Sequence, residues 1–307
     1  MKSLSFAASL GILASLLVAL RAEPETPGGA GFAAPEQALK ALQHAVEVKD
    51  QNQLRAIFGP EINEIANQDP VEATNEFVAV ARAMNESSRI VDGEEGRKLI
   101  EYGNDKTLFP VPLVKKDGQW YFDTAEGKEE LINRRIGRNE LETLDVVRTY
   151  VQAQRDYASA DRDDDEVLEY AQRFGSSPGK KDGLFWRPEI DGTISPLGPL
   201  VAEAEAVGYT KKTEQERQAF HGYFFRILTR QGKHAPGGAY DYIINGNMIG
   251  GFALVAWPAE YGETGVMTFI VNQQGRVYQK DLGSDTSKIA EATKAYDPDS
   301  TWSVSKE

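Results

Sequence analysis

Apolar positions recur at helical spacing over residues 35–81, near the start of the chain. The first apolar stripe follows Pro35, a residue that suits the first turn of a helix. A second helix is predicted from Asp50 to a stop at Gly59, and a third begins where Asp69 precedes Pro70. The members of the first stripe are Ala38, Leu39, Ala41, Leu42, Ala45 and Val46.

The pattern then changes to short strand-like runs. One run contains Leu99 and Ile100, and two more cover residues 108–114 and 119–122. An Asp-Gly pair, Asp117 and Gly118, separates the last two runs and predicts a hairpin. Residues 35–124 therefore read as helices followed by a small antiparallel sheet. This order of elements resembles the cystatin-like cone of the nuclear transport factor two superfamily.

Two further helices are predicted in the middle of the chain. The first covers about residues 125–136 and ends at Gly137, and Asn139 caps a second that continues to about Ala158. One face of the second helix is apolar apart from Gln154. Its members are Leu141, Leu144, Val147, Tyr150, Val151, Gln154 and Tyr157. We place a domain boundary near residue 138.

The remainder of the chain is predicted to be mostly strands. An acidic loop (160–166) leads to a short helix (167–174), and another helix covers about 197–207. Strands are predicted over 221–228, 239–244, 248–256, 265–271 and 276–280, with a closing helix over 287–296. The sequence thus predicts an α+β protein of two domains, 35–138 and 139–307, each with helices packed on a small antiparallel sheet.

The N-terminus has the pattern of a secretory signal peptide. Lys2 precedes an apolar run from Leu4 to Leu20, and small residues follow as far as Ala22. We expect cleavage after residue 22, followed by a flexible leader over 23–34. The chain has no cysteine, and no later segment is apolar enough to span a bilayer. The expectation is therefore a periplasmic protein without disulfides or a membrane span.

The charge of the chain excludes two classes of partner. The formal net charge is −13. Loss of residues 1–22 removes Lys2 and Arg21 and no acidic residue, so the mature chain is more negative still. Such a chain lacks the basic face that non-specific nucleic-acid binding or attachment to anionic lipid needs.

Four stretches of the sequence resemble a known family. They are residues 132–140 (INRRIGRNE), 168–172 (LEYAQ), 195–200 (SPLGPL) and 234–242 (HAPGGAYDY). In these stretches the chain resembles the exported bacterial proteins grouped as domain of unknown function 2950, over nearly the whole mature chain. The resemblance implies export and brings no known activity.

Residues 139–280 carry a second resemblance. A long helix beginning at Asn139 precedes Gly222-Tyr223-Phe224-Phe225, and later positions include Gly265, Phe269, Gly275 and Tyr278. This order is similar to the globular heads of type IV pilins and pseudopilins. The apolar N-terminal half-helix that polymerises in pilins is missing here. The resemblance thus implies a pilin-like head and not a filament subunit.

An acidic loop is the main candidate metal site. Asp161, Asp163 and Asp165 have the alternating spacing of a calcium loop, and Glu169 takes its ninth position. The sixth position holds Glu166 instead of the usual glycine, and the twelfth holds Gln172, which cannot act as a bidentate carboxylate. The alternative interpretation is a solvated acidic loop that joins two helices.

The loop at residues 232–242 is the main candidate for binding a partner or ligand. It combines polar and aromatic side chains with Pro236 and two glycines, and those side chains are Lys233, His234, Tyr240, Asp241 and Tyr242. The alternative is an ordered turn whose tyrosines pack on the sheet. The basic tract 133–138 is interpreted either as a set of surface ion pairs or as a docking element between the domains.

The histidines show no zinc motif. His44 is expected at the surface, and His221 and His234, which flank one strand, are expected to form structural hydrogen bonds. The sequence also lacks a nucleophile elbow, a phosphate-binding loop and a dinucleotide-binding motif. We therefore name no catalytic residue and no cofactor other than Ca²⁺ at the acidic loop.

Two functions remain open. The first is a non-enzymatic periplasmic protein that acts as a binding or assembly accessory in the cell envelope. The second is a small-molecule-binding or hydrolytic protein that uses a pocket in the N-terminal cone. A cone filled by Leu42, Phe58, Phe77, Phe109 and Trp120 would argue against the second function, and the oligomeric state stays open.

Overall fold

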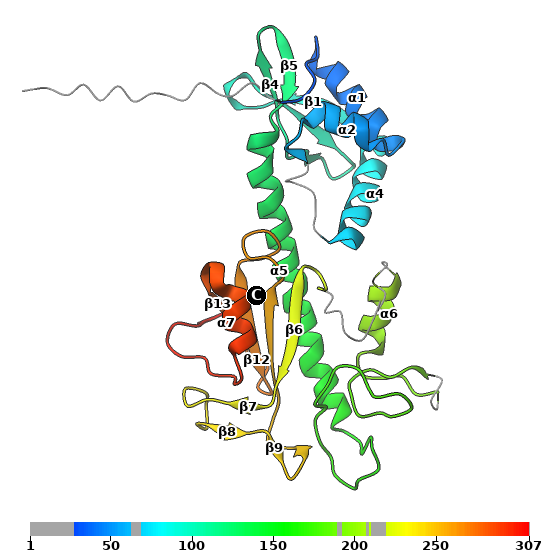
Figure 1. Ribbon diagram of the computed structural model, residues 1–307. Coiled ribbons are helices and arrows are strands. Elements are labelled where there is room, and N and C mark those ends of the chain that lie inside the picture. The colour runs from blue at the N-terminus through cyan, green and yellow to red at the C-terminus, as the bar shows by residue number, and fades with distance from the viewer. Residues whose placement is uncertain (1–27, 63–68, 189–191, 207–208, 210–218, 307) are drawn as a thin grey trace, which may run out of the picture.

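The computed structural model describes residues 28–62, 69–188, 192–206, 209 and 219–306 (Figure 1). The predicted signal peptide and residues 23–27 of the leader lie outside these ranges. In the described part of the chain, no helix combines the length and apolarity needed to cross a membrane. The protein is α+β, with helices packed on antiparallel sheets.

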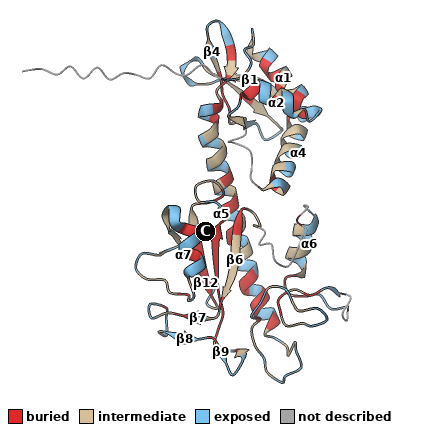
Figure 2. Cartoon of the chain, viewed as in Figure 1, coloured by how far each residue is buried: buried red, intermediate tan, exposed pale blue. Residues whose placement is uncertain are grey.

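Two separate hydrophobic clusters hold the described residues together (Figure 2). One cluster lies among residues 32–131 and the other among residues 144–302. We call the parts of the chain around them the first lobe and the second lobe. The division of the chain into two domains at residue 138 stays a prediction.

Three helices begin the first lobe: α1 (Pro35–Glu47), α2 (Gln51–Phe58) and α4 (Pro70–Glu86). Asp50 and Asp69 cap α2 and α4, each accepting from the backbone N–H two residues later at 2.9 Å. These contacts confirm the predicted helix starts, since a capping carboxylate satisfies amides that the first helical turn leaves unpaired.

The helices pack on a sheet of five strands in the order β1-β2-β4-β5, with β3 paired to β2. The strands are β1 (Ser88–Asp92), β2 (Lys98–Tyr102), β3 (Thr107–Leu108), β4 (Leu113–Lys116) and β5 (Gln119–Phe122), and a short 3₁₀ turn (Glu94–Gly96) joins β1 to β2. Lys116 pairs with Gln119, and Asp117 and Gly118 between them have φ values of 49° and 82°. This is the two-residue hairpin turn that the Asp-Gly pair predicted.

Large side chains fill the interior of the first lobe. Leu42, Phe58 and Trp120 belong to its buried cluster, and Phe77 and Phe109 pack against it. Residues 28–34, which the sequence assigned to a flexible leader, are held on the same lobe, because Phe32 and Trp120 exchange backbone hydrogen bonds of 2.8 and 2.7 Å.

One continuous helix of 34 residues, α5 (Thr124–Tyr157), joins the two lobes (Figure 1). The predicted helix end at Gly137 and helix start at Asn139 were wrong. A single glycine costs a helix only about 1 kcal/mol relative to alanine, and packing at both ends of α5 offsets that cost. The hydroxyl of Thr124 donates to the carbonyl of Phe58 at 2.7 Å, and Tyr150 lies in the core of the second lobe.

The second lobe is built on a sheet in the order β14-β13-β12-β11-β6. Its strands are β6 (Tyr223–Leu228), β11 (Ala253–Pro258), β12 (Met267–Asn272), β13 (Tyr278–Asp281) and β14 (Ser303–Val304). Both α5 and α7 (Thr286–Ala292) contact β11, every residue of which is buried. Since side chains alternate between the faces of a strand, both faces of this sheet are covered near β11.

Small elements complete the second lobe. Strand β7 (Arg230–Gln231) pairs with β8 (Tyr240–Asp241), and β9 (Ile243–Ile244) pairs with β10 (Asn247–Met248). Helix α6 (Gly198–Ala206) matches the helix predicted at 197–207, and a 3₁₀ turn (Gly283–Asp285) precedes α7. The strand predicted at 239–244 is divided into β8 and β9, and the strand predicted at 248–256 is divided into β10 and β11.

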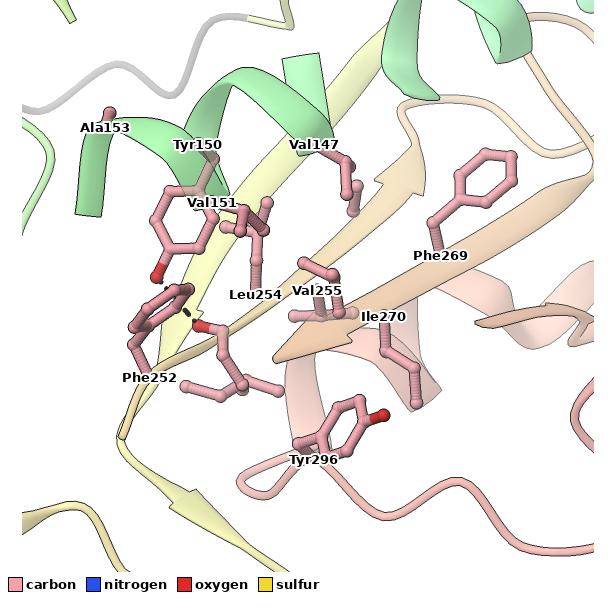
Figure 3. Close-up of a cluster of buried hydrophobic side chains, with 14 of the residues drawn as sticks. Val147, Tyr150, Val151, Ala153, Phe252, Leu254, Val255, Phe269, Ile270 and Tyr296 are labelled. Atoms are coloured by element: carbon pink, nitrogen blue, oxygen red, sulfur yellow. Dashed lines mark hydrogen bonds between the residues drawn. The ribbon is translucent and has the colours of Figure 1, made fainter. Parts of the chain in front are cut away.

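Buried polar contacts explain one further difference from the predicted elements. Tyr150 donates to the carbonyl of Ala253 at 3.1 Å in the core shown in Figure 3. The amide of Gln154 donates to Tyr150 and to the carbonyl of Ala171, and its oxygen accepts from the N–H of Ala171 at 2.9 Å. The N–H of Tyr170 donates to Met248. Residues 167–171 therefore have no regular secondary structure, and the short helix predicted at 167–174 is not formed.

Candidate functional site

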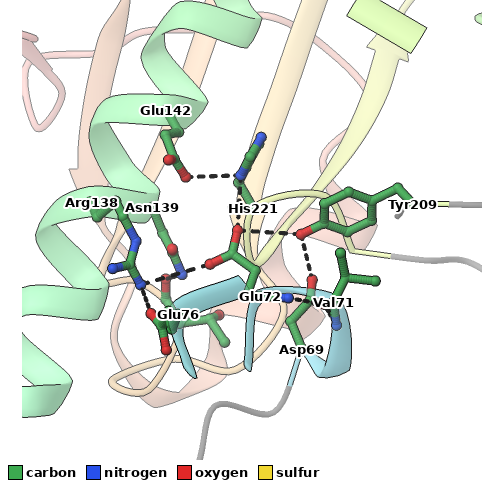
Figure 4. A network of polar contacts seen from close by, with 10 residues as sticks. Asp69, Val71, Glu72, Glu76, Arg138, Asn139, Glu142, Tyr209 and His221 are labelled. Carbon is green, nitrogen blue, oxygen red and sulfur yellow. Dashed lines mark hydrogen bonds and ion pairs between the residues drawn. The ribbon is translucent and has the colours of Figure 1, made fainter. Parts of the chain in front are cut away.

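A group of polar side chains lies where the two lobes meet (Figure 4). It draws on α4 and the residue that caps it, on α5, on one residue that follows α6, and on the chain just before β6. We call this group the junction cluster, and its members are Asp69, Glu72, Glu76, Arg138, Glu142, Tyr209 and His221. Its central members, Glu72, Glu142 and His221, place one ligand atom each within 4.8 Å of one another.

His221 lies between two carboxylates. Its Nδ1 atom is 2.9 Å from Oε1 of Glu72 and 2.8 Å from Oε2 of Glu142. The contact with Glu72 has hydrogen-bond geometry. Oε2 of Glu142 is buried and forms no well-aligned hydrogen bond with any described residue. A ring nitrogen carries a single proton, so Nδ1 cannot serve both carboxylates equally.

The charges of the junction cluster support one another. Burial disfavours the charged imidazole, but contacts with the Glu142 and Glu72 carboxylates outweigh it and raise the pKa of His221 to about 9. Burial also disfavours the Glu72 carboxylate, but His221 and Arg138 outweigh it and lower the pKa of Glu72. Without another cation at this point, His221 is therefore an imidazolium at neutral pH.

Other side chains fix the position of Glu72. The hydroxyl of Tyr209 lies 2.7 Å from Oδ2 of Asp69 and 3.3 Å from Oε1 of Glu72. Burial raises the pKa of Tyr209, so its hydroxyl stays protonated and donates. Arg138 pairs with Glu76 and lies 3.7 Å from Oε2 of Glu72. Glu72 is therefore held on both of its oxygens.

The backbone at His221 is in a strained conformation. His221 and Gly222 have φ values of 49° and 70°, in the left-handed region. A Cβ atom at Gly222 would lie 2.5 Å from Nδ2 of Asn139 and 2.9 Å from Cβ of Thr264. Asn139 in turn donates to the carbonyl of Thr264 at 2.9 Å. Strain of this kind persists only where the surroundings enforce it, and here it directs the imidazole toward the two glutamates.

The sequence did not predict the junction cluster, because its central residues come from three distant segments with no local motif. His221 was expected to form structural hydrogen bonds, and its ring forms one with Glu72 of the first lobe and an ion pair with Glu142 on α5. His234 instead pairs with Asp297 at 3.0 Å, so the two histidines share no partner. His44 is exposed, as expected. Two arginines of the basic tract 133–138 contact both lobes. Arg138 lies 3.7 Å from Glu72 on α4 in the first lobe, and Arg135 lies 3.9 Å from Glu263 in the second lobe.

The acidic loop brings three of its four predicted ligands together. Ligand atoms of Asp161, Asp163 and Asp165 lie within 4.8 Å of one another. Glu166, at the position that calcium loops give to glycine, has a φ of 67°. The side chain of Asp161 accepts the backbone N–H groups of Asp164 and Glu166, both at 2.9 Å. The loop therefore adopts the left-handed turn that the missing glycine had put in doubt.

Glu169 stands apart from the three aspartates. Its carboxylate accepts from the backbone N–H of Met248 at 2.7 Å, while Asp165 accepts from the amide of Asn247 at 2.8 Å. These contacts dock the loop on β10. Partial burial and repulsion from the neighbouring Asp165 and Asp161 carboxylates raise the pKa of Asp163.

The loop at 232–242 is ordered and largely exposed. Lys233, His234, Tyr240 and Asp241 are exposed, whereas Tyr242 is fully buried and donates to Gln231 at 3.0 Å. The amide of Gln231 donates to the carbonyls of Pro236 and Gly238 at 2.8 and 2.7 Å. Asp241 pairs with Arg230 at 2.9 Å. Tyr242 is thus a structural residue inside the loop, and the other four predicted residues face solvent.

An apolar groove of about 250 Å³ lies in the second lobe between α5, α6 and β6. Its lining includes Val146, Leu200, Phe220 and Phe224. This groove lies in the second lobe, away from the cone where the sequence suggested a pocket.

Comparison with known proteins gives a family and no activity. The chain has no significant match among curated proteins or among solved structures. The likeness of the second lobe to pilin heads therefore stays a prediction, as does the likeness of the first lobe to a cystatin-like cone. A family model described as "Protein of unknown function (DUF2950)" matches residues 30–305. The chain belongs to this family.

Proposed function

We propose that this chain is an exported protein of the cell envelope that acts without catalysis, as a binding or assembly accessory. Export is supported by the signal-peptide pattern of residues 1–22. The acidic charge of the chain favours a protein partner over nucleic acid or anionic lipid.

The observation that carries this proposal is an exposed surface with a fixed backbone at the end of the second lobe where β7–β10 lie (Figure 1). Tyr240, Ile244 and Ile249 are 39%, 46% and 44% exposed there, Lys233 adds a positive charge, and Asp241 is exposed beside its partner Arg230. Leaving Arg230 aside, we call these five residues the distal surface. The hydrogen bonds of Gln231 and Tyr242 hold the loop before any partner arrives, which lowers the entropy lost on binding. Aromatic and apolar side chains on such a surface are typical binding residues.

The alternative function needs a pocket inside the first lobe. The five side chains that would close such a pocket all belong to, or pack against, the buried cluster of that lobe. Neighbouring aromatic rings touch across it, with centroids of Phe58 and Phe122 4.9 Å apart. This packing favours the binding accessory over a ligand or substrate site in the cone.

A capture experiment tests the distal surface. The chain without residues 1–22 is immobilised and exposed to envelope extract of the native host. We expect one stoichiometric partner, which is lost with Tyr240→Ala/Ile244→Ala. The control is Leu141→Ala, which alters a side chain 66% exposed on α5. Failure to recover a specific partner, or equal recovery by the double variant, contradicts the proposal.

Export has a separate test. Fractionation of the native host should place the protein in the periplasm, and mass spectrometry should find a mature N-terminus close to Glu23. Full-length protein in the cytoplasm would contradict export and leave the distal surface to be judged by the capture experiment.

We propose Ca²⁺ binding at the acidic loop as a second activity. The convergence of Asp161, Asp163 and Asp165 and the left-handed turn at Glu166 favour it. Calorimetric titration with Ca²⁺ should give heat with the parent and none with Asp161→Ala/Asp163→Ala. Glu203→Ala/Glu205→Ala removes two exposed charges from α6 and serves as the control. Equal traces for the parent and the aspartate variant would end this idea.

A further inference from the structure

We propose that Glu72, Glu142 and His221 form a binding site for a divalent first-row transition metal, for which Zn²⁺ is the best-matched ion. The site lies at the junction of the lobes, away from the distal surface and from the acidic loop. It does not depend on the proposed function.

The spacing of the three side chains fits a coordination sphere. Zinc binds imidazole nitrogen and carboxylate oxygen at roughly 2.0–2.2 Å, so neighbouring ligand atoms stand about 2.8–3.5 Å apart. Nδ1 of His221 is 2.9 Å from Oε1 of Glu72 and 2.8 Å from Oε2 of Glu142. Both distances lie at the short end of that range, and a small outward movement of the glutamates would admit the ion.

The donor atoms select the kind of metal. One imidazole nitrogen and two carboxylates suit Zn²⁺, Mn²⁺ or Fe²⁺, whereas Ca²⁺ and Mg²⁺ prefer sites made of oxygen alone. Three protein ligands also leave a position open for water. The acidic loop offers carboxylate oxygens alone, so it suits Ca²⁺ better than a transition metal.

Two carboxylate oxygens converge on one ring nitrogen, an arrangement that a metal ion between the three groups would satisfy better than a single proton does. Oε2 of Glu142 is buried and forms no well-aligned hydrogen bond with a described residue, although it lies close to Nδ1. Nδ1 carries at most one proton, so it can donate fully to only one of the two carboxylates. A metal ion in place of that proton would contact both carboxylates and the ring nitrogen at once. The displaced proton passes to the buffer.

The surroundings of the site orient its ligands. Tyr209 lies within hydrogen-bond distance of Oε1 of Glu72, and Arg138 lies near Oε2 of the same residue (Figure 4). The left-handed backbone at His221 and Gly222 fixes the imidazole on the other side. Outer contacts of this kind fix ligand orientation in metal sites, and their loss typically weakens metal binding 10–100-fold.

Calorimetry of the chelator-treated full chain tests the proposal with Zn²⁺ and then Mn²⁺. We expect one Zn²⁺ per chain at the junction, with affinity at least tenfold lower in His221→Gln and in Glu142→Gln. Tyr209→Phe keeps all three ligands and should weaken binding about tenfold. His234→Gln, at the exposed pair with Asp297, and Asp161→Ala/Asp163→Ala should leave this binding event unchanged.

Absence of Zn²⁺ binding to the parent, or equal affinity in His221→Gln, would overturn the site. Loss of binding only in Asp161→Ala/Asp163→Ala would assign the ion to the acidic loop instead. X-ray absorption of the Zn²⁺-loaded parent gives an answer that requires no variant. One imidazole with oxygen neighbours is expected, and a shell of oxygen alone would overturn the proposal.

Discussion

His221→Gln in the metal-free protein should weaken the contact between the lobes in a pH-dependent way. The charged imidazole lies between Glu72 on α4 and Glu142 on α5, with Arg138 and Tyr209 also facing Glu72. Glutamine keeps a similar size and a hydrogen-bond donor but carries no charge. The substitution thus removes the ionic part of the contact.

The magnitude follows from proton linkage. A rise in the His221 pKa from 6.5 to about 9 corresponds to roughly 3 kcal/mol of stability. Because the folded-state pKa is the higher one, this stability is fully present below pH 6.5 and is lost as the pH rises through about 9. The lowered pKa of Glu72 reflects the same interaction and is not added to it.

Urea unfolding with EDTA, measured at intervals from about pH 6 to pH 9.5, tests this prediction. The difference in unfolding free energy between the parent and His221→Gln should be greatest near pH 6, and only a small part of it should remain above pH 9. His234→Gln, which alters a half-exposed pair, should show a difference below about 1 kcal/mol throughout. A parent-minus-variant difference that does not change with pH would refute the reasoning.

Four further substitutions separate backbone effects from the effects of buried hydrogen bonds. Gly137→Ala should raise the free energy of unfolding by up to about 1 kcal/mol, and the melting temperature with it, since no described atom would contact the new Cβ. Gly222→Ala should lower the free energy of unfolding by about 1–3 kcal/mol, because Gly222 has a φ of 70° and a Cβ there would collide with Asn139 on α5. Equal melting temperatures for these two variants would contradict both expectations. Gln154→Leu should cost about 3 kcal/mol by leaving the N–H and carbonyl of Ala171 unpaired, and melting within 1 °C of the parent would contradict it. Tyr242→Phe should cost about 1 kcal/mol in urea unfolding, and an unchanged midpoint would show that its hydroxyl contributes nothing.

Local signals predicted the elements that local chemistry determines. Asp50 and Asp69 cap their helices as expected, and Asp117-Gly118 forms the predicted hairpin turn. At the helix starts, a carboxylate beside the first turn accepts the backbone N–H groups, and at the hairpin the Asp-Gly pair tolerates the positive φ values that the turn requires. The α+β class followed from these signals.

Tertiary contacts decided the elements that the sequence missed. Gly137 resembles a helix end, yet α5 passes through it because both halves of the helix are packed. Residues 167–171 have a helical pattern, but Gln154 takes the backbone groups of Ala171 that a helix would use. Neither outcome is visible in a short window of sequence.

The candidate sites divide in the same way. Asp161, Asp163 and Asp165 lie within five residues, so their convergence followed from spacing. The junction residues Glu72, Glu142 and His221 meet only when α4 docks on α5 and β6. Tyr242 belonged to the predicted binding loop, but it is buried and supports the loop instead. Which of the two tyrosines of the loop, Tyr240 or Tyr242, is buried depends on how the loop packs on the rest of the second lobe.

Photo-cross-linking in the native host tests the envelope-binding function most directly. A photoreactive amino acid is placed at Tyr240 or Ile244 of the distal surface, and at Leu141 on α5 as an exposed control position. We predict one cross-linked envelope protein from positions 240 and 244 and none from position 141. Cross-links of equal yield and identity from all three positions, or none from positions 240 and 244, would contradict the assignment of a partner to the distal surface.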